Sequence, residues 1–294
     1  MLTRSDVLKF VSQAEYSMSI GDVEAARLSY DQFWDSSASV FFSLFKYPEI
    51  EKFHNQFVRK LVMKDVLKQK IHDGRPFSLT LPYCGPDRFT TIEIPKECIA
   101  YINSDKTANK HRRRVEKYVD GQVESYAPFY IMDWVLPDLL SIIPRVSLDR
   151  RRLLNLGAGA GCLDIMLCIV LSDLKACVQV EPFDTGRESC AALAEANDIE
   201  YCKALQPDDN IAKYGPFDLV LSCRAMSYIF SAGEYASVLD RNLTENTEAF
   251  IDIRCNDWGQ SEETMLSNWF KQSKPYATQG AGLKASKRFF LEKN

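Results

Sequence analysis

The segment LLNLGAGAGCLDI at residues 153–165 constrains the fold of this chain more than any other segment. An apolar run typical of a buried strand leads into Gly157, Gly159 and Gly161, and an apolar helical pattern follows. Glycine suits positions where φ is positive or where a ligand approaches the backbone closely. A glycine turn between a strand and a helix also directs free N–H groups toward a ligand. We therefore expect a strand–loop–helix unit that binds a nucleotide-type cofactor.

The spacing of the glycines selects among the known cofactor loops. Dinucleotide-binding loops follow G-x-G-x-x-G/A, which places a small residue where this chain has Cys162. Here the glycines fall at every second position, and this pattern resembles the class I S-adenosylmethionine-dependent methyltransferases. The first motif of that family is a strand ending in (D/E)-x-G-x-G-x-G, so Asn155 stands where the family has an acid that supports the methionine part of the cofactor. Asn155 either takes that role without a charge or is a structural residue that bridges the glycine loop.

A second strand is predicted at 177–181 (CVQVE), and it ends in Glu181. An acid at the end of a strand, about 20 residues after the glycines, suits a pair of ribose hydroxyls. In the resembled family this acid holds the cofactor ribose, and the loop at 206–210 contacts adenine; the alternative is a surface glutamate before Pro182. The implied cofactor is S-adenosyl-L-methionine, and the expected cofactor-binding residues are Asn155, Gly157, Gly159, Gly161, Glu181, Pro182, Phe183, Gln206 and Cys223.

The rest of residues 126–294 alternates between strand-like and helix-like segments. A helix is expected at 188–197, and further strands are expected at 199–202, 217–223 and 248–255. Apolar strands separated by helices predict an α/β fold with a parallel sheet covered on both faces. The resemblance implies a Rossmann-like, seven-stranded, mostly parallel sheet, with the tail at 282–294 as its antiparallel edge strand. The lysines of that tail would protect the edge of the sheet.

Residues 1–125 are predicted to form a smaller, mainly helical α+β cap domain ahead of the methyltransferase domain at 126–294. Asp22 can cap a helix that runs to Asp35, and residues 49–71 have helical spacing. Two strand-like runs at 77–81 and 88–94 flank a turn and suggest a hairpin. This cap would select the substrate, mediate a homodimer or only stabilise the fold.

Candidate substrate-binding residues come from two regions. The segment 128–143 is predicted to form a helix that Pro137 kinks, and in the resembled fold such a segment runs beside the cofactor. Tyr126 and Tyr130 could therefore line the cleft, although aromatic residues at helical spacing are often core. The other candidates follow the strands at 217–223 and 248–255, where loops converge at the carboxyl ends of a parallel sheet. These candidates are Arg224, Tyr228 and Arg254, although each arginine could instead pair with a nearby acid.

The reaction is predicted by exclusion and by the physics of methyl transfer. The chain lacks N/D-P-P-Y/F/W after the fourth strand, a Pro-Cys nucleophile, and the paired-glutamate loop of protein arginine methyltransferases. O-methylation of a small-molecule or glycan acceptor is therefore favoured, with N- or C-methylation of a small molecule left open. A hydroxyl acceptor needs a base. Asp257 is the first candidate by position and His111 the second by pKa, although Asp257 could instead cap a helix.

Composition bounds the remaining possibilities. A net charge of −4 argues against nucleic acid as a partner, and the lack of an 18-residue apolar stretch predicts no membrane span and a cytoplasmic protein. Nine cysteines without a C-x-x-C spacing fit reduced packing residues, and three histidines without paired ligand spacing predict no metal site. Basic residues at 110–114 keep an RNA methyltransferase as an alternative, and Asn155 keeps a non-catalytic cofactor-binding regulatory or scaffold protein. A nicotinamide oxidoreductase ranks lower because of Cys162.

Overall fold

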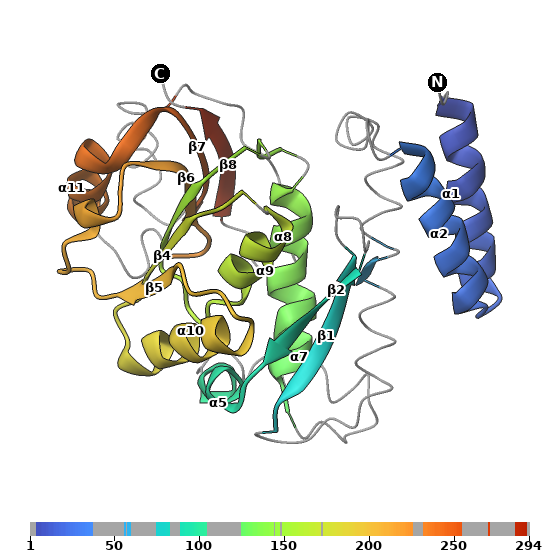
Figure 1. Ribbon diagram of the computed structural model, residues 1–294, viewed down its shortest axis with the longest axis horizontal. Helices are drawn as coiled ribbons and strands as arrows, with labels where there is room; N and C mark the ends of the chain where they lie inside the picture. Colours follow the sequence, from blue (N-terminus) through green and yellow to red (C-terminus); the bar gives the residue numbers. More distant parts are fainter. Residues whose placement is uncertain are drawn as a thin grey trace. The chain divides into compact units, whose positions relative to one another are not determined.

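The computed structural model describes residues 4–37, 56, 58–59, 75–82, 89–104, 125–143, 145–147, 149–171, 173–225, 232–254, 270 and 286–292. The chain divides into two compact units (Figure 1). The first contains residues 1–70 and 79–92, and the second contains residues 71–78 and 93–294. Among the described residues, no helix has both the length and the apolar character needed to span a bilayer.

The first unit contains two helices that pack against each other, α1 (Arg4–Ser19) and α2 (Val23–Ser37). The predicted N-cap is correct, because Asp22 Oδ1 accepts a hydrogen bond of 3.0 Å from the backbone N–H of Ala25. Val11, Ala14, Ala26 and Tyr30 are buried in this unit, whereas Tyr16, Ile20 and Leu28 are exposed. Of the predicted helix at 49–71, nearly all residues lie outside the described part of the chain.

The predicted pair of strands is present as β1 (Phe77–Pro82) and β2 (Phe89–Ile94), which form a two-stranded sheet. The turn between them lies outside the described residues. Helix α5 (Lys96–Ser104) follows β2 and packs against helix α10 (Asp184–Ala196). Asn197, just after α10, exchanges two hydrogen bonds of 2.9 Å with the backbone of Glu93 and so fixes this contact.

The second unit is built on a six-stranded sheet in the order β5-β4-β3-β6-β7-β8 (Figure 1). The first five strands of that order are parallel, and β8 pairs antiparallel with β7. The bounds are β3 (Arg152–Leu156), β4 (Ala176–Val180), β5 (Cys202–Leu205), β6 (Phe217–Ser222), β7 (Leu243–Arg254) and β8 (Ser286–Glu292). The α/β class and the final antiparallel strand are as predicted, and the described residues contain six of the seven strands expected.

One strand prediction is displaced, and one helix begins earlier than predicted. Strand β5 starts at Cys202, where the predicted strand at 199–202 ends. The reason is the end of α10: Asp198 has a φ of 55°, and the N–H of Ile199 bonds to the Ala194 oxygen at 2.9 Å. Ile199 therefore belongs to the C-terminal turn of the helix. Helix α10 starts at Asp184 rather than at 188.

Side chains alternate between the two faces of the sheet, and helices cover both. On one face, the even-numbered residues of β3 and β4 share a core with Tyr235 and Leu239 of α11 (Ala232–Asn242). On the other face, the odd-numbered residues Asn155 and Gln179 contact α9 (Cys162–Val170). The first core is mainly hydrophobic, with a buried contact between the hydroxyls of Ser222 and Tyr235, whereas the face under α9 carries a buried carboxylate with two amide partners.

A continuous helical segment precedes β3, as predicted for 128–143. It consists of α7 (Ala127–Tyr130), a π-helical turn η1 (Ile131–Val135) and α8 (Leu136–Ile142). The π turn ends two residues before Pro137, and the kink expected at the proline stays a prediction. Pro137 stands in the first turn of α8, where its missing N–H is tolerated.

Two carboxylates fix the amino-terminal ends of the central strands. Glu248 accepts hydrogen bonds from Ser147 N at 2.9 Å, Ser147 Oγ at 2.7 Å and Arg150 Nε at 2.9 Å. The Arg150 and Glu248 side chains are only 13% and 10% exposed. Asp218 accepts from the backbone N–H groups of Arg151 and Arg152.

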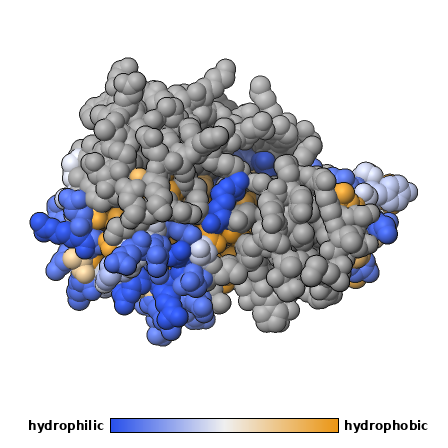
Figure 2. All heavy atoms as spheres, turned by 90° about the horizontal axis from the view of Figure 1, so that it is seen from above, coloured by the Kyte–Doolittle hydropathy of each residue, from blue (hydrophilic) through white to orange (hydrophobic). Residues whose placement is uncertain are grey.

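On the face drawn in Figure 2, the described surface is mostly hydrophilic, with hydrophobic side chains in separate patches.

Candidate cofactor site

The glycine loop joins β3 to α9 at the carboxyl end of the sheet. Gly157, Gly159 and Gly161 have φ values of 85°, 60° and 80°, which confirms that these positions need glycine. The amides of Gly157 and Ala158 bond to the Val180 oxygen at 2.8 and 3.2 Å, and the amide of Gly161 bonds to the Ala158 oxygen at 3.0 Å. The expectation that the loop presents free N–H groups is wrong for these three amides, because they fix the loop to β4 and to itself.

The two later glycines of the loop have different surroundings. A Cβ on Gly161 would lie 2.8 Å from Gln179 Nε2 and 3.2 Å from the Cα of Cys190, so this position allows close packing of α9 on the sheet and α10. Among the described residues, a Cβ on Gly159 would meet only the hydroxyl of Tyr130, at 4.0 Å. Gly161 is therefore a packing position, and Gly159 is the position at which the loop faces Tyr130.

Glu181 directly follows β4 and is fully buried. Its Oε2 accepts a hydrogen bond from Gly159 N at 2.8 Å, and its Oε1 accepts one from Phe183 N at 3.2 Å. Burial raises the pKa of Glu181, and these two backbone hydrogen bonds oppose that shift. Gly186 is needed beside it, because a Cβ there would lie 2.6 Å from Glu181 Cγ. The carboxylate therefore binds the glycine loop to the segment that follows β4.

A buried carboxylate that the sequence analysis missed lies under the loop. Asp164 of α9 is 0% exposed, and its two oxygens accept hydrogen bonds from Asn155 Nδ2 at 2.7 Å and from Gln179 Nε2 at 3.0 Å. Burial is the largest cause of a pKa raised to about 7 for Asp164. Asn155 Oδ1 is buried and has no hydrogen-bond partner among the described residues. The amide group of Asn155 thus holds Asp164, and a role of Asn155 toward the cofactor stays a prediction.

Three other predicted cofactor residues lie after β4 and β5. Phe183, at the start of α10, is 55% exposed, which is unusual for a large hydrophobic side chain, and Pro182 before it is half-buried. Gln206 follows β5 and is exposed, and its backbone N–H donates to Asp209 Oδ2 at 2.7 Å. Because β4 and β5 are parallel neighbours, the segments after them meet at the same edge of the sheet. Cys223 follows β6 and is half-buried.

A row of aromatic side chains leads away from Gly159. The rings of Tyr126 and Tyr130 meet edge to face with centroids 6.3 Å apart, and those of Tyr130 and Trp134 are nearly parallel at 6.4 Å. The guanidinium of Arg224 lies 4.8 Å above the ring of Trp134. Tyr126 is buried, in keeping with the core alternative, whereas Tyr130 is half-buried.

Arg224, predicted to bind substrate, forms an ion pair within the protein. Its NH2 donates to Asp138 Oδ1 at 2.8 Å, and its NH1 lies 2.6 Å from Asp138 Oδ2. NH2 also donates to the Trp134 carbonyl oxygen at 3.2 Å. The alternative in which this arginine pairs with an acid is therefore the one that the structure contains. Arg224 has a φ of 61°, a strained conformation for a residue with a side chain.

The side chains of the remaining predicted site residues lie outside the described part of the chain. His111, Tyr228 and Asp257 lie outside the described residues. Arg254 is the last residue of β7, and its side chain is likewise not described. Both candidate bases and two of the substrate-binding candidates therefore stay predictions.

Comparisons with known proteins give similarity to solved structures alone. No protein-family model and no curated protein matches the chain. The chain is similar to a SAM-dependent methyltransferase from Aquifex aeolicus, with 10% identity and a TM-score of 0.45 over 62% of this chain and 98% of that chain. A TehB-like SAM-dependent methyltransferase from Corynebacterium glutamicum has 11% identity and a TM-score of 0.42 over 64% of this chain and 98% of that chain.

The chain is also similar to the fibrillarin pre-rRNA processing protein of Methanococcus jannaschii, with 14% identity and a TM-score of 0.43 over 53% of this chain and 74% of that chain. Two of these three proteins bear the name of the family that the glycine motif resembles.

Proposed function

We propose that this chain is an S-adenosylmethionine-dependent methyltransferase that acts on a hydroxyl of a small-molecule or glycan acceptor. One observation carries the proposal: Glu181 Oε2 accepts a hydrogen bond of 2.8 Å from Gly159 N. This contact joins the acid at the end of β4 to the positive-φ glycine loop after β3. One nucleoside can therefore meet both the loop and the acid, as the resemblance requires.

The residues around Glu181 fit a nucleoside cofactor. A carboxylate has about four lone-pair positions, and two are used by the amides of Gly159 and Phe183, so two remain for ribose hydroxyls. Because Glu181 is fully buried, we infer that the segment after β4 shifts when the ribose binds. The exposed ring of Phe183 would stack on adenine, with the loop that begins at Gln206 beside it.

The bound cofactor would supply a sulfonium methyl group as the electrophile for in-line attack by the acceptor. The protein then has to align the acceptor and accept its proton. We assign alignment to Tyr130, whose hydroxyl lies next to Gly159, and we assign Arg224 to holding Trp134 in the aromatic row rather than to binding an anionic substrate. Asp257 and His111 stay the candidate bases.

The role of residues 1–125 also belongs to this proposal. We propose that they form a cap that selects the acceptor or that they mediate a homodimer, in a cytoplasmic protein. The exposed Tyr16 of α1, Ile20 of the following turn and Leu28 of α2 support a contact surface there. Size-exclusion chromatography with light scattering on the whole chain, with and without the substitution Ile20→Glu, distinguishes a dimer from a monomeric cap.

A second function is supported by one specific observation. Asn155 donates to Asp164 and carries no charge, so the acid that supports the methionine part of the cofactor in the resembled family has no counterpart at position 155. A protein that binds the cofactor without turnover would have the same loop and the same Glu181. Binding and catalysis therefore need separate tests.

Calorimetric titration with S-adenosylmethionine and S-adenosylhomocysteine tests binding. We expect both to bind and the substitution Glu181→Gln to weaken binding at least about tenfold, since a hydrogen bond to a charged group contributes about 1.5–3 kcal/mol. Glu188→Gln is the matched control, because Glu188 is an exposed glutamate of the same helix that follows Glu181. Absence of binding by the folded wild-type protein, or tighter binding of a nicotinamide dinucleotide, contradicts the proposal.

Methyl transfer tests catalysis. The whole chain is incubated with methyl-labelled cofactor and a set of hydroxylated acceptors, and labelled product is measured. We expect Tyr130→Phe to raise KM for the acceptor, because loss of one neutral hydrogen bond costs about 1 kcal/mol. The same substitution should leave cofactor affinity within about twofold. Cofactor binding without turnover of any acceptor favours the regulatory or scaffold alternative, and turnover of RNA alone contradicts the acceptor class.

A further inference from the structure

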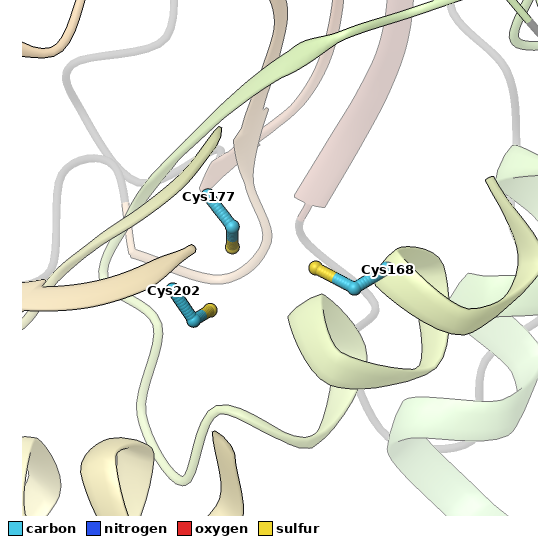
Figure 3. A group of neighbouring side chains, drawn as sticks. All are labelled: Cys168, Cys177 and Cys202. Atoms are coloured by element: carbon cyan, nitrogen blue, oxygen red, sulfur yellow. The ribbon is translucent and has the colours of Figure 1, made fainter. Parts of the chain in front are cut away.

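Three cysteines meet in the interface between α9 and the sheet, away from the nucleoside residues. Cys168 comes from α9, Cys177 from β4 and Cys202 from β5, and their Sγ atoms all lie within 4.8 Å of one another. Figure 3 shows the three sulfurs pointing toward a common centre. All three residues are buried, with 4%, 0% and 9% exposure.

The fold explains how residues so distant in sequence converge. Cys177 and Cys202 are register partners on adjacent parallel strands, so their side chains lie on the same face of the sheet. Cys168 lies four residues after Asp164, so both face the sheet from the same side of α9. Three regular elements, rather than loops, therefore position the thiols.

We propose that Cys168, Cys177 and Cys202 bind one Zn²⁺ ion. Zinc–sulfur bonds are about 2.3 Å long, which places sulfurs about 3.8–4.0 Å apart in a tetrahedral or trigonal arrangement. The sulfurs are within 4.8 Å of one another, so each pair needs to approach by less than about 1 Å. Thiolates are soft ligands, and this donor set selects Zn²⁺ over Mg²⁺ or Ca²⁺.

Two polar groups lie beside the cluster. Cys202 Sγ donates to Gln179 Oε1 at 3.5 Å, a hydrogen bond that metal coordination would replace, and the hydroxyl of Tyr201 donates to the Cys168 carbonyl oxygen at 3.4 Å. Zinc is almost always four-coordinate, and we assign the fourth position to an oxygen ligand on the side of Tyr201. Each thiol loses its proton to solvent on coordination, so binding releases up to three protons. The complex of Zn²⁺ with three thiolates has a net charge of −1.

The ion would act on the cofactor site through rigidity rather than through contact. Helix α9 begins immediately after the glycine loop, and β4 ends immediately before Glu181. A metal ion that joins α9 to β4 and β5 would fix α9 and β4 at the ends that lie away from the glycine loop and Glu181. The site goes beyond the proposed methyltransferase function, because it would exist even if the chain bound no nucleoside.

The test uses the whole chain, reduced and stripped of metal with a chelator. Zn²⁺ is titrated against a chromogenic chelator, bound metal is counted by mass spectrometry after desalting, and Cd²⁺ reports thiolate ligation by its charge-transfer absorption. We expect one equivalent of metal and at least about a 100-fold loss of affinity in Cys168→Ala and Cys202→Ala. Cys98→Ala is the matched control, because Cys98 is an equally buried thiol outside the cluster, 3.4 Å from Cys162.

The outcomes distinguish metal bound by the three cysteines from metal bound at other thiols, and they distinguish a lost site from a misfolded variant. Folded wild-type protein that retains less than about 0.2 equivalents overturns the proposal, as does equal metal content in the cluster variants and in the control. If Cys168→Ala is unfolded by circular dichroism, Cys202→Ala decides, because Cys202 lies nearer the surface. Zn²⁺ should also raise the melting temperature of the wild type and of Cys98→Ala, but not of the cluster variants.

Discussion

Asp164 should make the parallel sheet less stable as the pH rises, and replacing it should remove that dependence. Burial raises the pKa of Asp164 from 3.8 to about 7 in the folded protein, against hydrogen bonds from Gln179 and Asn155 that lower it. In the unfolded chain, the same carboxyl group loses its proton near its ordinary pKa. Between these two values the folded state binds more protons than the unfolded state, so the free energy of unfolding falls with increasing pH.

The size of the effect follows from the two pKa values. Each pH unit over which the folded state holds one extra proton lowers the free energy of unfolding by about 1.4 kcal/mol. At pH 5 the folded state binds nearly one more proton than the unfolded state, and at pH 7 it binds about half a proton more. We therefore expect the wild type to lose about 2 kcal/mol over this range from Asp164 alone.

The substitution Asp164→Asn keeps the shape and removes the charge. The new amide carries two N–H donors, and Asn155 can accept one of them by turning its side-chain amide over, because Asn155 Oδ1 has no partner among the described residues. The variant should therefore fold, and it should be more stable than the wild type at pH 7. Its free energy of unfolding should change by less than about 0.5 kcal/mol between pH 5 and pH 7 from this site.

Hydrogen exchange of the buried amides in β3 and β4, followed by mass spectrometry at pH 5, 6 and 7, measures the opening free energy of this part of the fold. Asp184→Asn is the control, because this exposed acid should leave the wild-type pH dependence unchanged. Equal slopes in the wild type and Asp164→Asn would refute the reasoning. A variant destabilised equally at every pH would assign Asp164 a packing role without a charge penalty.

Three further substitutions test the support of the site. Gly161→Ala should lower the free energy of unfolding by about 2–4 kcal/mol in chemical denaturation, because its φ is 80° and its Cβ would lie 3.0 Å from Cys190 Sγ. Glu248→Gln should lower it by about 3 kcal/mol, since Arg150 is left beside a neutral partner; the exposed Glu245→Gln should leave it unchanged. Arg224→Lys should lower the melting temperature and reduce quenching of tryptophan fluorescence, because lysine cannot both pair with a carboxylate in bidentate fashion and stack on a ring.

The parts of the fold that local sequence signals determine were predictable. A positive φ at Gly157, Gly159 and Gly161 follows from alternating glycines between a strand and a helix, and Glu181 follows from its place at the end of an apolar run. The resemblance implied an antiparallel strand at the edge of the sheet, and β8 is that strand. For the glycines and Glu181, the residues that decide the conformation are close together in sequence.

The missed residues depend on contacts between elements distant in sequence. Asp164 of α9 accepts a hydrogen bond from Gln179 of β4, and Asp138, the partner of Arg224, lies 86 positions away from it. Cys168, Cys177 and Cys202 have no metal-binding spacing, and only the strand register brings them together. One signal was available for Asp164: it is the single charged residue in the otherwise apolar helix CLDIMLCIV, and such a residue needs buried partners.

The π-helical turn at 131–135 sets the register of the aromatic row. An α-helix rotates about 100° per residue, so four residues overshoot a full turn by about 40°. The wider π turn rotates less per residue, and it carries Trp134, whose ring is nearly parallel to that of Tyr130 and lies under Arg224. The row therefore depends on the number of residues in this segment as well as on the aromatic side chains at positions 130 and 134. Exchange of one apolar residue for another preserves it, whereas deletion of a single residue would rotate Trp134 away by about 100°.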